Sequence, residues 1–343
     1  MRDERTGASE PVAGTALDLA VAEVAELGQA VLDRVRQVVV GMDEALCLSL
    51  ASLLAGGHVL FEDVPGLGKT LAARSLSAAL GLDFQRVQCT PDLLPADITG
   101  SFVYDPAVHE FDFRPGPVFT GLLLADEVNR TPPKTQSALL EAMAEGQVTV
   151  EGRTFPLPRP FLVVATSNPV EYEGTYNLPE AQLDRFMVRL AVGYPARQQE
   201  QRILLNRIGR GQEESVVEPV ADAATFLRMQ RAVEHVHVDP DIAGYCVDLA
   251  NGTREHPAVD VGASPRGSQA LMLLARSLAV LDGRDFLTPE DVKRTAVPVL
   301  AHRLTLTARA WAEGVPATEV VTAVVGSVPG PPVVGLARPL APS

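Results

Sequence analysis

The stretch that decides the fold is Val59-Leu60-Phe61-Glu62-Asp63-Val64-Pro65-Gly66-Leu67-Gly68-Lys69-Thr70, in which an apolar run leads into a glycine-rich turn. We expect a buried strand, a turn and the start of a helix, in that order. Glycines let backbone N–H groups approach phosphate oxygens at a helix N-terminus. Lys69 would reach the terminal phosphates, and the Thr70 hydroxyl could ligate Mg²⁺. The strict motif has glycine at position 63, where this chain has Asp63, so a glycine-rich turn without a ligand is the alternative interpretation.

A second motif follows along the chain, where Leu122-Leu123-Leu124-Ala125 runs directly into Asp126-Glu127. An apolar strand of this kind delivers two carboxylates to the carboxyl edge of a sheet, where α/β sheets bind ligands. Asp126 is expected in the Mg²⁺ shell, and Glu127 is expected to orient or deprotonate the attacking water. Alone, the pair could simply end a strand, but after a phosphate loop it favours a hydrolytic site. Thr131 is expected to cap the next helix, which Gly146 ends.

Around these motifs, strands and helices alternate, which predicts an α/β fold with a parallel sheet flanked by helices, followed by a small all-α lid domain. Strands are expected at 59–61, 84–88, 121–125, 161–166 and 187–192, with hairpins at 101–113 and 147–157. The predicted domains are an N-terminal leader and helix (1–36), a nucleotide-binding core (37–195), a linker region (196–220), a helical lid (221–312) and a partly disordered tail (313–343).

The bulk composition restricts the function. With 43 acidic and 29 basic side chains the net charge is −14, which gives no long-range attraction to nucleic acid or anionic lipid. Cys47, Cys89 and Cys246 are widely spaced and are expected to be reduced thiols. The most apolar stretch, 45–61, is too interrupted to cross a membrane. We therefore expect a cytoplasmic protein without membrane insertion or nucleic-acid partner.

With both motifs in place, the chain resembles the MoxR family of AAA+ ATPases. The resemblance covers about residues 37–306, and Asp63 fits it, because Glu-Asp-Val-Pro-Gly is common at this position in the family. The matching stretches are residues 60–70, 90–100, 125–143, 165–169, 178–186, 262–266 and 300–304.

The resemblance implies an ATP site with Mg²⁺. Asn168 matches the polar sensor that contacts the γ-phosphate and the attacking water. Val40 and Gly41 match the segment that lies against adenine. Thr70 and Asp126 would hold Mg²⁺, Asp126 through water. The implied nucleotide-binding residues are Val40, Gly41, Pro65, Gly66, Leu67, Gly68, Lys69, Thr70, Leu71 and Asp126.

Two arginines complete the implied catalytic set of Glu127, Asn168, Arg185 and Arg266. Arg185 matches the arginine finger that one subunit supplies to its neighbour's ATP, with Arg130 and Arg189 as competing candidates. Arg266 matches the sensor arginine of the lid. It follows a capping Ser264 and a Pro265, and a cation in the first turn opposes the helix dipole, which favours an external anion. Whether Arg266 reaches its own or a neighbouring nucleotide is open at this stage.

By resemblance, the function is ATP hydrolysis by a homo-oligomer, a hexameric ring, that drives chaperone-like remodelling or maturation of proteins, including metal or cofactor insertion. The implied partners are protein clients or proteins with von Willebrand A domains. The hairpin at 101–113 could face a client or merely pack. The alternatives are a nucleic-acid motor or regulator, which the acidic charge disfavours, and a nucleotide sensor with little turnover, which the complete hydrolytic set disfavours.

Overall fold

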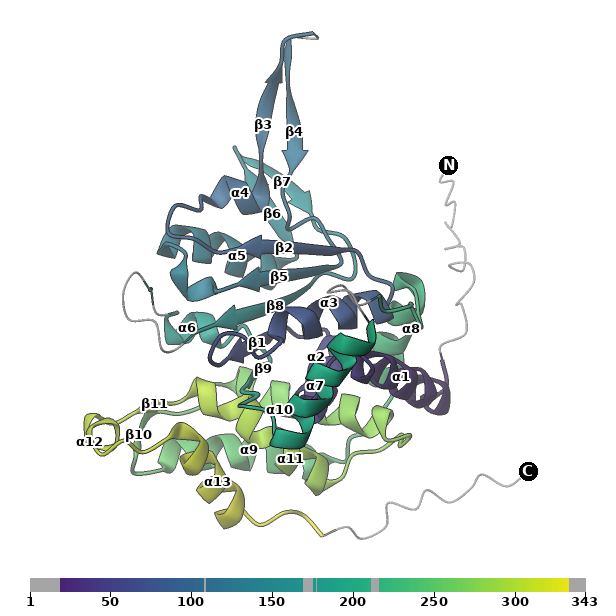
Figure 1. The fold of residues 1–343 in the computed structure, drawn as a ribbon. Helices are drawn as coiled ribbons and strands as arrows, with labels where there is room; N and C mark the ends of the chain where they lie inside the picture. The colour runs from purple at the N-terminus through teal and green to yellow at the C-terminus, as the bar shows by residue number, and fades with distance from the viewer. Residues whose placement is uncertain (1–18, 108, 169–174, 177, 211–215, 333–343) are drawn as a thin grey trace, which may run out of the picture.

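The centre of the molecule is a five-stranded sheet with strand order β2-β5-β8-β1-β9 (Figure 1). The computed structural model describes residues 19–107, 109–168, 175–176, 178–210 and 216–332. The strands are β1 Val59–Glu62, β2 Phe84–Gln88, β5 Leu122–Asp126, β8 Leu162–Ser167 and β9 Val188–Leu190. Every neighbouring pair is parallel. All carboxyl ends therefore lie at one edge of the sheet and all amino ends at the other.

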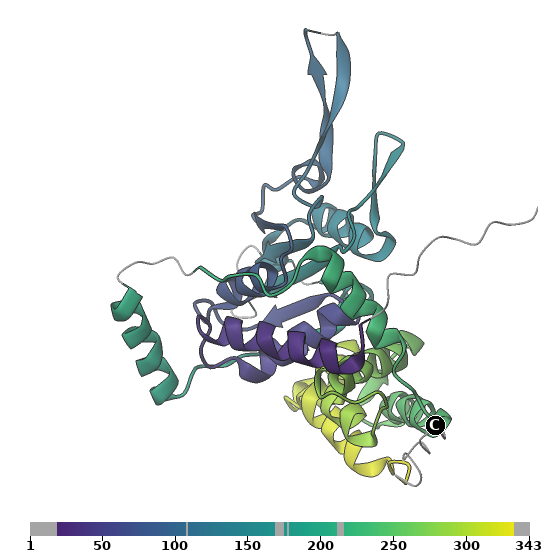
Figure 2. The same ribbon diagram turned by 90° about the vertical axis from the view of Figure 1, so that its right-hand side faces the viewer.

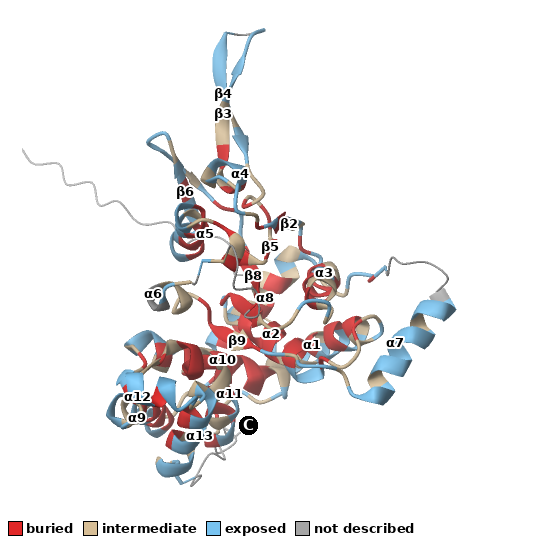
Figure 3. Ribbon diagram, turned by 60° about the vertical axis from the view of Figure 1, so that its left-hand side comes forward, coloured by how far each residue is buried: buried red, intermediate tan, exposed pale blue. Residues whose placement is uncertain are grey.

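Side chains of the central strands alternate between two apolar cores, as the pleat of a strand requires. Leu122 and Leu124 belong to the core shared with α1, α2, α3 and the lid, whereas Leu123 belongs to the core shared with α4 and α5. Both faces of the sheet are thus covered (Figure 3), which explains the nearly continuous apolar run of β5. These helices are α1 Val21–Arg36, α2 Asp43–Leu54, α3 Lys69–Ala79, α4 Pro95–Thr99 and α5 Pro133–Glu145.

Most helices of the lid lie below the sheet in Figure 1, and α8 lies beside the sheet. The lid joins the same apolar core as one sheet face, and α1 packs against both α3 and α10. Gly28 of α1 lies so close to Leu281 that an added Cβ would come within 2.3 Å of a Leu281 methyl. The lid elements are α8 Ala223–Glu234, α9 Pro240–Glu255, β10 Val259–Val261, α10 Pro265–Leu281, α11 Pro289–Leu300, β11 Thr305–Leu306 and α12 Ala308–Ala312.

The segment after residue 312, which we expected to be a tail, contains the helix α13 Ala317–Ser327. Its Val320, Val321 and Val324 are buried, and the helix packs against α9 and α11. Residues 313–327 therefore continue the lid, because three valines on one helical face supply a core surface. Residues 333–343 of the expected tail lie outside the described part of the chain.

The helix after β5 starts differently from the prediction. Thr131 does not cap it: α5 begins at Pro133 with Pro132 as its N-cap, because the chain first makes a 3₁₀ turn at Val128–Arg130. Gly146 ends the helix in a left-handed conformation, as expected, with φ of 61°. The short helices α4 and α6 Glu180–Leu183 precede a hairpin and β9, respectively.

Two hairpins rise from the core at the top of Figure 1. They are β3 Gly100–Asp105 with β4 Glu110–Pro115, and β6 Gln147–Val150 with β7 Arg153–Pro156. At the base of the first, Phe113 stacks on Phe155 of the second with ring centroids 4.0 Å apart. Near its tip, Tyr104 and Phe111 contact each other and are 47% and 67% exposed. The aromatic residues at the base therefore pack, and those at the tip face outward.

Helix α7 Arg197–Arg210 stands apart from the body of the molecule (Figure 2). Leu204, Leu205 and Ile208 on it are exposed. Among the described residues, no helix combines the length and apolar character that a membrane crossing needs.

His58, just before β1, is a buried histidine held in one tautomer. Its Nδ1 accepts a hydrogen bond from the Val163 N–H at 3.1 Å, so Nε2 carries the proton that is shared with the Met143 carbonyl oxygen at 3.2 Å. Burial lowers the pKa of His58 to about 4, and the Met143 hydrogen bond only partly opposes this.

This histidine predicts a pH dependence of stability. Since the folded-state pKa lies below the unfolded value of about 6.5, only the unfolded chain gains the proton between these values, and stability falls as the pH falls through that window. At pH 5 the loss relative to pH 7 is ~2 kcal/mol. Urea unfolding followed by circular dichroism at both pH values should show this loss reduced by a similar amount in His58→Gln, but not in the exposed-site control His237→Gln. An unchanged loss in His58→Gln would contradict the assignment.

Candidate functional site

The phosphate loop leaves the carboxyl end of β1 and enters α3 at Lys69. Gly66 and Gly68 have φ of 83° and 85°, a left-handed conformation that glycine adopts without steric cost. Lys69 is buried, and its Nζ donates to the carbonyl oxygens of Asp63 at 2.6 Å and Val64 at 3.2 Å. The loop therefore curls around the lysine amine at the start of a helix.

The charge of Lys69 is partly desolvated. Burial lowers its pKa, and the nearby carboxylates of Asp63, Asp126 and Glu127 oppose that shift. A buried ammonium is stabilised by any further negative charge. A polyphosphate held by the loop would supply that charge.

Asp126, at the carboxyl end of β5, accepts hydrogen bonds on both oxygens. Oδ2 accepts from the Thr70 hydroxyl at 3.2 Å and from Arg86 Nη2 at 2.7 Å, and Oδ1 accepts from the Thr166 hydroxyl at 2.6 Å. A hydroxyl and a carboxylate side by side are the hard oxygen ligands that Mg²⁺ prefers. The donor set that we predicted for the metal, Thr70 and Asp126, thus meets at this edge and fits the ion.

Glu127 follows in a left-handed backbone conformation, with φ of 58°, which is uncommon for a residue with a side chain. Its Oε2 accepts from Gln88 Nε2 at 3.0 Å and from Arg130 Nη1 at 2.9 Å. Arg130, one candidate for the interface finger, therefore faces the acid of its own subunit.

Asn168 lies just past β8 and is buried. Its carbonyl oxygen accepts from Asn129 Nδ2 at 3.0 Å, which ties the end of β8 to the turn after Glu127. One pocket at the carboxyl edge brings the predicted residues together. It is lined by Pro65, Gly66, Leu67, Gly68, Lys69, Thr70, Asp126, Glu127, Thr166, Ser167 and Asn168.

A second, mainly apolar pocket adjoins the phosphate loop, with Gly66, Leu67 and Gly68 in both linings. Its volume of about 700 Å³, open solvent included, is within the range of ligand pockets. Val40, Gly41 and Leu71, which we predicted to contact the nucleotide, line it together with Ile203 and Asn206 of α7. A flat apolar group attached to a phosphate chain would fit these two adjoining pockets.

Asp63, the departure from the strict motif, connects the phosphate loop to this second pocket. Its Oδ2 accepts from the N–H groups of Val192 at 2.7 Å and Gly193 at 2.6 Å, and its Oδ1 accepts from the Val64 N–H. Partial burial alone would raise the pKa of Asp63, but these three N–H donors, with Lys69, outweigh it and lower the pKa. Glycine could not make these contacts.

A third pocket gathers arginines at the opposite edge of the sheet. It is lined by Ala55, Gly56, Gly57, His58, Met143, Ala144, Asp184, Arg185, Met187, Arg266, Gln269, Ala270, Leu273 and Arg303. The Met187 N–H donates to the His58 carbonyl oxygen, so this pocket lies at the amino end of β1. β1 has four residues, which puts its two ends roughly 10 Å apart. In the described part of the chain, no residue lines both this pocket and the phosphate pocket.

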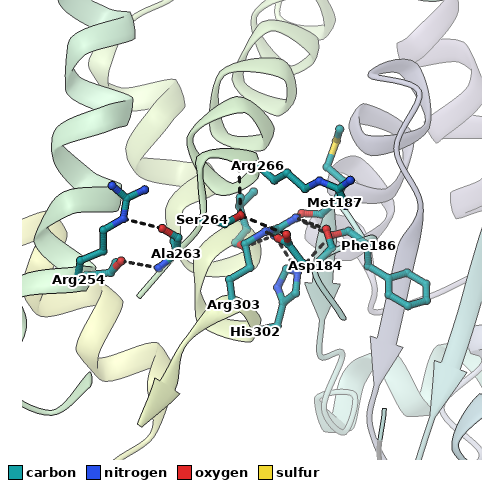
Figure 4. A network of polar contacts seen from close by, with 11 residues as sticks. Asp184, Phe186, Met187, Arg254, Ala263, Ser264, Arg266, His302 and Arg303 are labelled. Atoms are coloured by element: carbon teal, nitrogen blue, oxygen red, sulfur yellow. Dashed lines mark hydrogen bonds and ion pairs between the residues drawn. The ribbon is translucent and has the colours of Figure 1, made fainter. Parts of the chain in front are cut away.

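The three candidate fingers have different surroundings. Arg189 pairs with Glu62 at 3.1 Å and Arg130 with Glu127, both within the subunit. Arg185 lies in the arginine pocket, and its neighbour Asp184 pairs with Arg303 rather than with it. Among the described residues nothing accepts a hydrogen bond from Arg185 Nε. Ser264 caps α10 as predicted, and the exposed Arg266 lies in the first turn, beside Met187 in Figure 4.

Comparison with known proteins identifies the family. Residues 58–188 match the model described as the ATPase family associated with various cellular activities (AAA), and residues 251–324 match an AAA lid domain. The chain is 49% identical to the uncharacterised protein YeaC of Bacillus subtilis over 89% of this chain and 95% of YeaC. It is 42% identical to chaperone MoxR1 of Mycobacterium tuberculosis, over 91% of this chain and 84% of MoxR1. The chain belongs to the MoxR family of AAA ATPases.

The fold of this MoxR-family chain also has a solved counterpart. A protein from Cytophaga hutchinsonii with a provisional ATPase name aligns with a TM-score of 0.84 and 38% identity, over 90% of this chain and 96% of that one. Family membership implies nucleotide binding, and the two adjoining pockets at the carboxyl edge supply a site for it.

Arg86 and Gln88 are site residues that sequence reasoning missed. Both lie on β2, whose pairing with β5 brings residues 86 and 88 beside 124 and 126. The sequence offered one signal, since polar side chains at alternate positions of a strand next to the acidic strand point to the same face.

Asp63 yields the prediction for this site. Asp63→Ala removes the acceptor for three backbone N–H groups. The phosphate loop is then no longer held against residues 192–193. We expect the Kd for a fluorescent ATP analogue, measured by anisotropy, to rise roughly tenfold, equivalent to ~1.4 kcal/mol. Asp33→Ala, which removes an acid in α1, is the control. An unchanged Kd in Asp63→Ala would contradict this role.

Proposed function

We propose that the chain hydrolyses ATP with Mg²⁺ at the carboxyl edge of its sheet, as a MoxR-type ATPase. The observation that carries this proposal is the meeting of Lys69, Thr70, Asp126, Glu127 and Asn168 in one pocket. Each has the chemistry that phosphoryl transfer to water needs, and they come from three separate segments of the sequence. A sensor with little turnover would have no use for Glu127 beside that pocket.

Each of these residues has a separate role in the proposed reaction. Lys69 and the loop N–H groups bind the phosphates. Thr70 and Asp126 hold Mg²⁺, which when bound neutralises charge on the phosphate oxygens. Glu127 orients and deprotonates the attacking water, and Asn168 orients the γ-phosphate and that water. Gln88 and Arg130 both donate to Glu127 Oε2, so Oε1 is the oxygen that would accept from the attacking water.

Arg185 and Arg266 act on the ATP of a neighbouring subunit. They lie at the amino edge of the sheet, so β1 separates them from their own phosphate pocket. Both arginines are available in a pocket where Asp184 is engaged by Arg303. A neighbouring triphosphate at this edge would receive two cations, and an arginine finger is worth ~10³–10⁵ in kcat.

If the amino edge of one subunit acts on the carboxyl edge of the next, the subunits assemble head to tail. Such an assembly closes into a ring when the rotation between neighbouring subunits brings the last one back to the first. Helix α7 supports such an assembly, because its exposed Leu204, Leu205 and Ile208 form an apolar surface that a partner would cover. The hexameric ring size follows from the resemblance alone.

The work of the motor is remodelling of protein partners, in keeping with the chaperone name of the relative from Mycobacterium tuberculosis. We place client contact at the tip of the β3–β4 hairpin, where Tyr104 and Phe111 are exposed. Proteins with von Willebrand A domains, and metal or cofactor insertion, remain predictions from the resemblance. The net charge of −14 disfavours nucleic acid, and the three free cysteines fit a cytoplasmic location.

The Glu127→Gln variant tests the hydrolytic role. The amide keeps the size of the side chain but cannot accept the proton of water, so turnover should fall by ~10²-fold or more, while the Kd for ATP stays unchanged. Phosphate release and binding of a fluorescent ATP analogue measure the two quantities. Glu141→Gln, at an exposed position on α5, is the matched control. Undiminished hydrolysis in Glu127→Gln would rule out the proposed role.

A further inference from the structure

Asp184 is the residue directly before Arg185, and its carboxylate is held from the lid. Oδ1 accepts from Arg303 Nε at 2.7 Å, and Oδ2 accepts from the Ser264 hydroxyl at 3.1 Å (Figure 4). Arg303 and Ser264 lie far along the chain, at the end of the turn after α11 and at the N-cap of α10. The turn between α6 and β9 in the core is thus joined to two lid elements through one side chain.

Arg303 forms hydrogen bonds along the turn that contains Arg185. Its side chain is only 3% exposed. Beyond Asp184 Oδ1, it donates to the carbonyl oxygens of Asp184 at 3.3 Å, Phe186 at 2.7 Å and Met187 at 3.2 Å, and to that of Val299 in α11. All three guanidinium nitrogens are used, which a lysine ammonium could not reproduce.

Ser264 links the first turn of α10, which contains Arg266, to Asp184, the residue before Arg185. Its hydroxyl oxygen accepts from the Arg266 N–H at 3.2 Å and donates to Asp184 Oδ2. The loop before it is fixed in turn, because Arg254 Nε donates to the Ala263 carbonyl oxygen and the Ala263 N–H donates to the Thr253 hydroxyl. Arg266 therefore begins a helix whose cap is bonded to the residue preceding Arg185.

Because of these contacts, residues 184–187 cannot move independently of the lid. A buried ion pair with further hydrogen bonds is costly to break on one side, since the remaining charge stays desolvated. Movement of the lid must then carry residues 184–187 with it or break the pair. His302 adds to the link with a hydrogen bond between its Nε2 and the Phe186 carbonyl oxygen.

We propose that Asp184 and Arg303 are positioning residues that couple the lid to the placement of Arg185 and Arg266 against the neighbouring subunit's ATP. The proposal rests on the proposed action of these arginines across the interface. It assigns to the lid a role in its neighbour's hydrolysis, separate from any role at its own nucleotide. A lid displacement in one subunit would thus change the hydrolysis rate in the next.

Mixed assemblies test the coupling. Glu127→Gln subunits cannot hydrolyse ATP but can donate the arginines, and Arg185→Ala subunits can hydrolyse but lack a finger. Neither is expected to be active alone. In a one-to-one mixture about a quarter of the head-to-tail interfaces pair a donor with an acceptor, and the rate should recover in proportion. If this starting mixture stays inactive, the proposed action across the interface fails, and the coupling fails with it.

Asp184→Asn is then added to one subunit type at a time. In the Glu127→Gln donor it should lower the recovered rate about tenfold or more, since small displacements of a catalytic group cost that much. In the Arg185→Ala acceptor it should leave the rate unchanged. Asp282→Asn, which weakens a partly exposed lid ion pair with Arg284, is the matched control and should have no effect in either subunit.

A purely structural role for Asp184 predicts a different pattern. It would lower the recovered rate equally from both subunit types, and that result, or no effect from either, would overturn the proposal. The Kd of the doubly substituted donor for a fluorescent ATP analogue should match that of Glu127→Gln, because its own pocket lies at the other edge. Arg303→Lys, which keeps the charge without the planar fork, should repeat the donor-specific loss.

Discussion

Parallel strand pairing gives this sheet two chemically different edges, and the placement of every functional side chain depends on that polarity. The carboxyl edge receives the phosphate loop, Asp126, Glu127 and Asn168, because β1, β5 and β8 all end there. Arg185 lies at the amino edge because it shortly precedes β9, and Arg266 lines the same pocket from helix α10 of the lid. Under the proposed function, the arginines and the phosphate loop lie at opposite edges of one sheet, so a subunit would not complete its own site.

Two aspartates hold distant segments of the chain near the two ends of the sheet strands, and one of these segments belongs to the lid. Asp63 at the carboxyl edge binds the N–H groups of Val192 and Gly193, shortly before α7. Asp184 at the amino edge binds Arg303 and Ser264 of the lid. Each is a carboxylate next to a residue set that the reaction needs, and each is satisfied by donors from a distant segment. Core and lid are also joined away from these positions, because Arg294 of α11 pairs with Glu44 of α2 and Gln230 of α8 donates to the Leu53 carbonyl oxygen.

Local patterns predicted the sheet because its strands carry strong local signals. The run Leu122–Asp126 is apolar until its last residue and wholly buried, and the glycines before Lys69 have the positive φ that the motif requires. Helix α4 was missed because five residues in a polar segment carry no periodicity. Helix α13 was missed because the Pro- and Gly-rich sequence after it dominated the composition of that region.

The contacts that organise the site were beyond sequence reasoning for a different reason. Arg303 and Asp184 are 119 positions apart, and Arg86 and Asp126 are 40 apart. Such pairs depend on the strand order and on the packing of the lid. Neither can be inferred from the spacing of residues within a short stretch of sequence. The resemblance in sequence could therefore name Arg185 and Arg266, but it left open which nucleotide Arg266 faces.

The central claim is that the ATP site is divided between two subunits, and the dependence of hydrolysis on assembly tests it most directly. Phosphate release per subunit would be measured across protein concentrations that span dissociation, with sedimentation velocity on the same samples. We predict a rate near zero for the monomer that rises in proportion to the assembled fraction. A monomer that hydrolyses ATP as fast per subunit as the assembly would contradict the account.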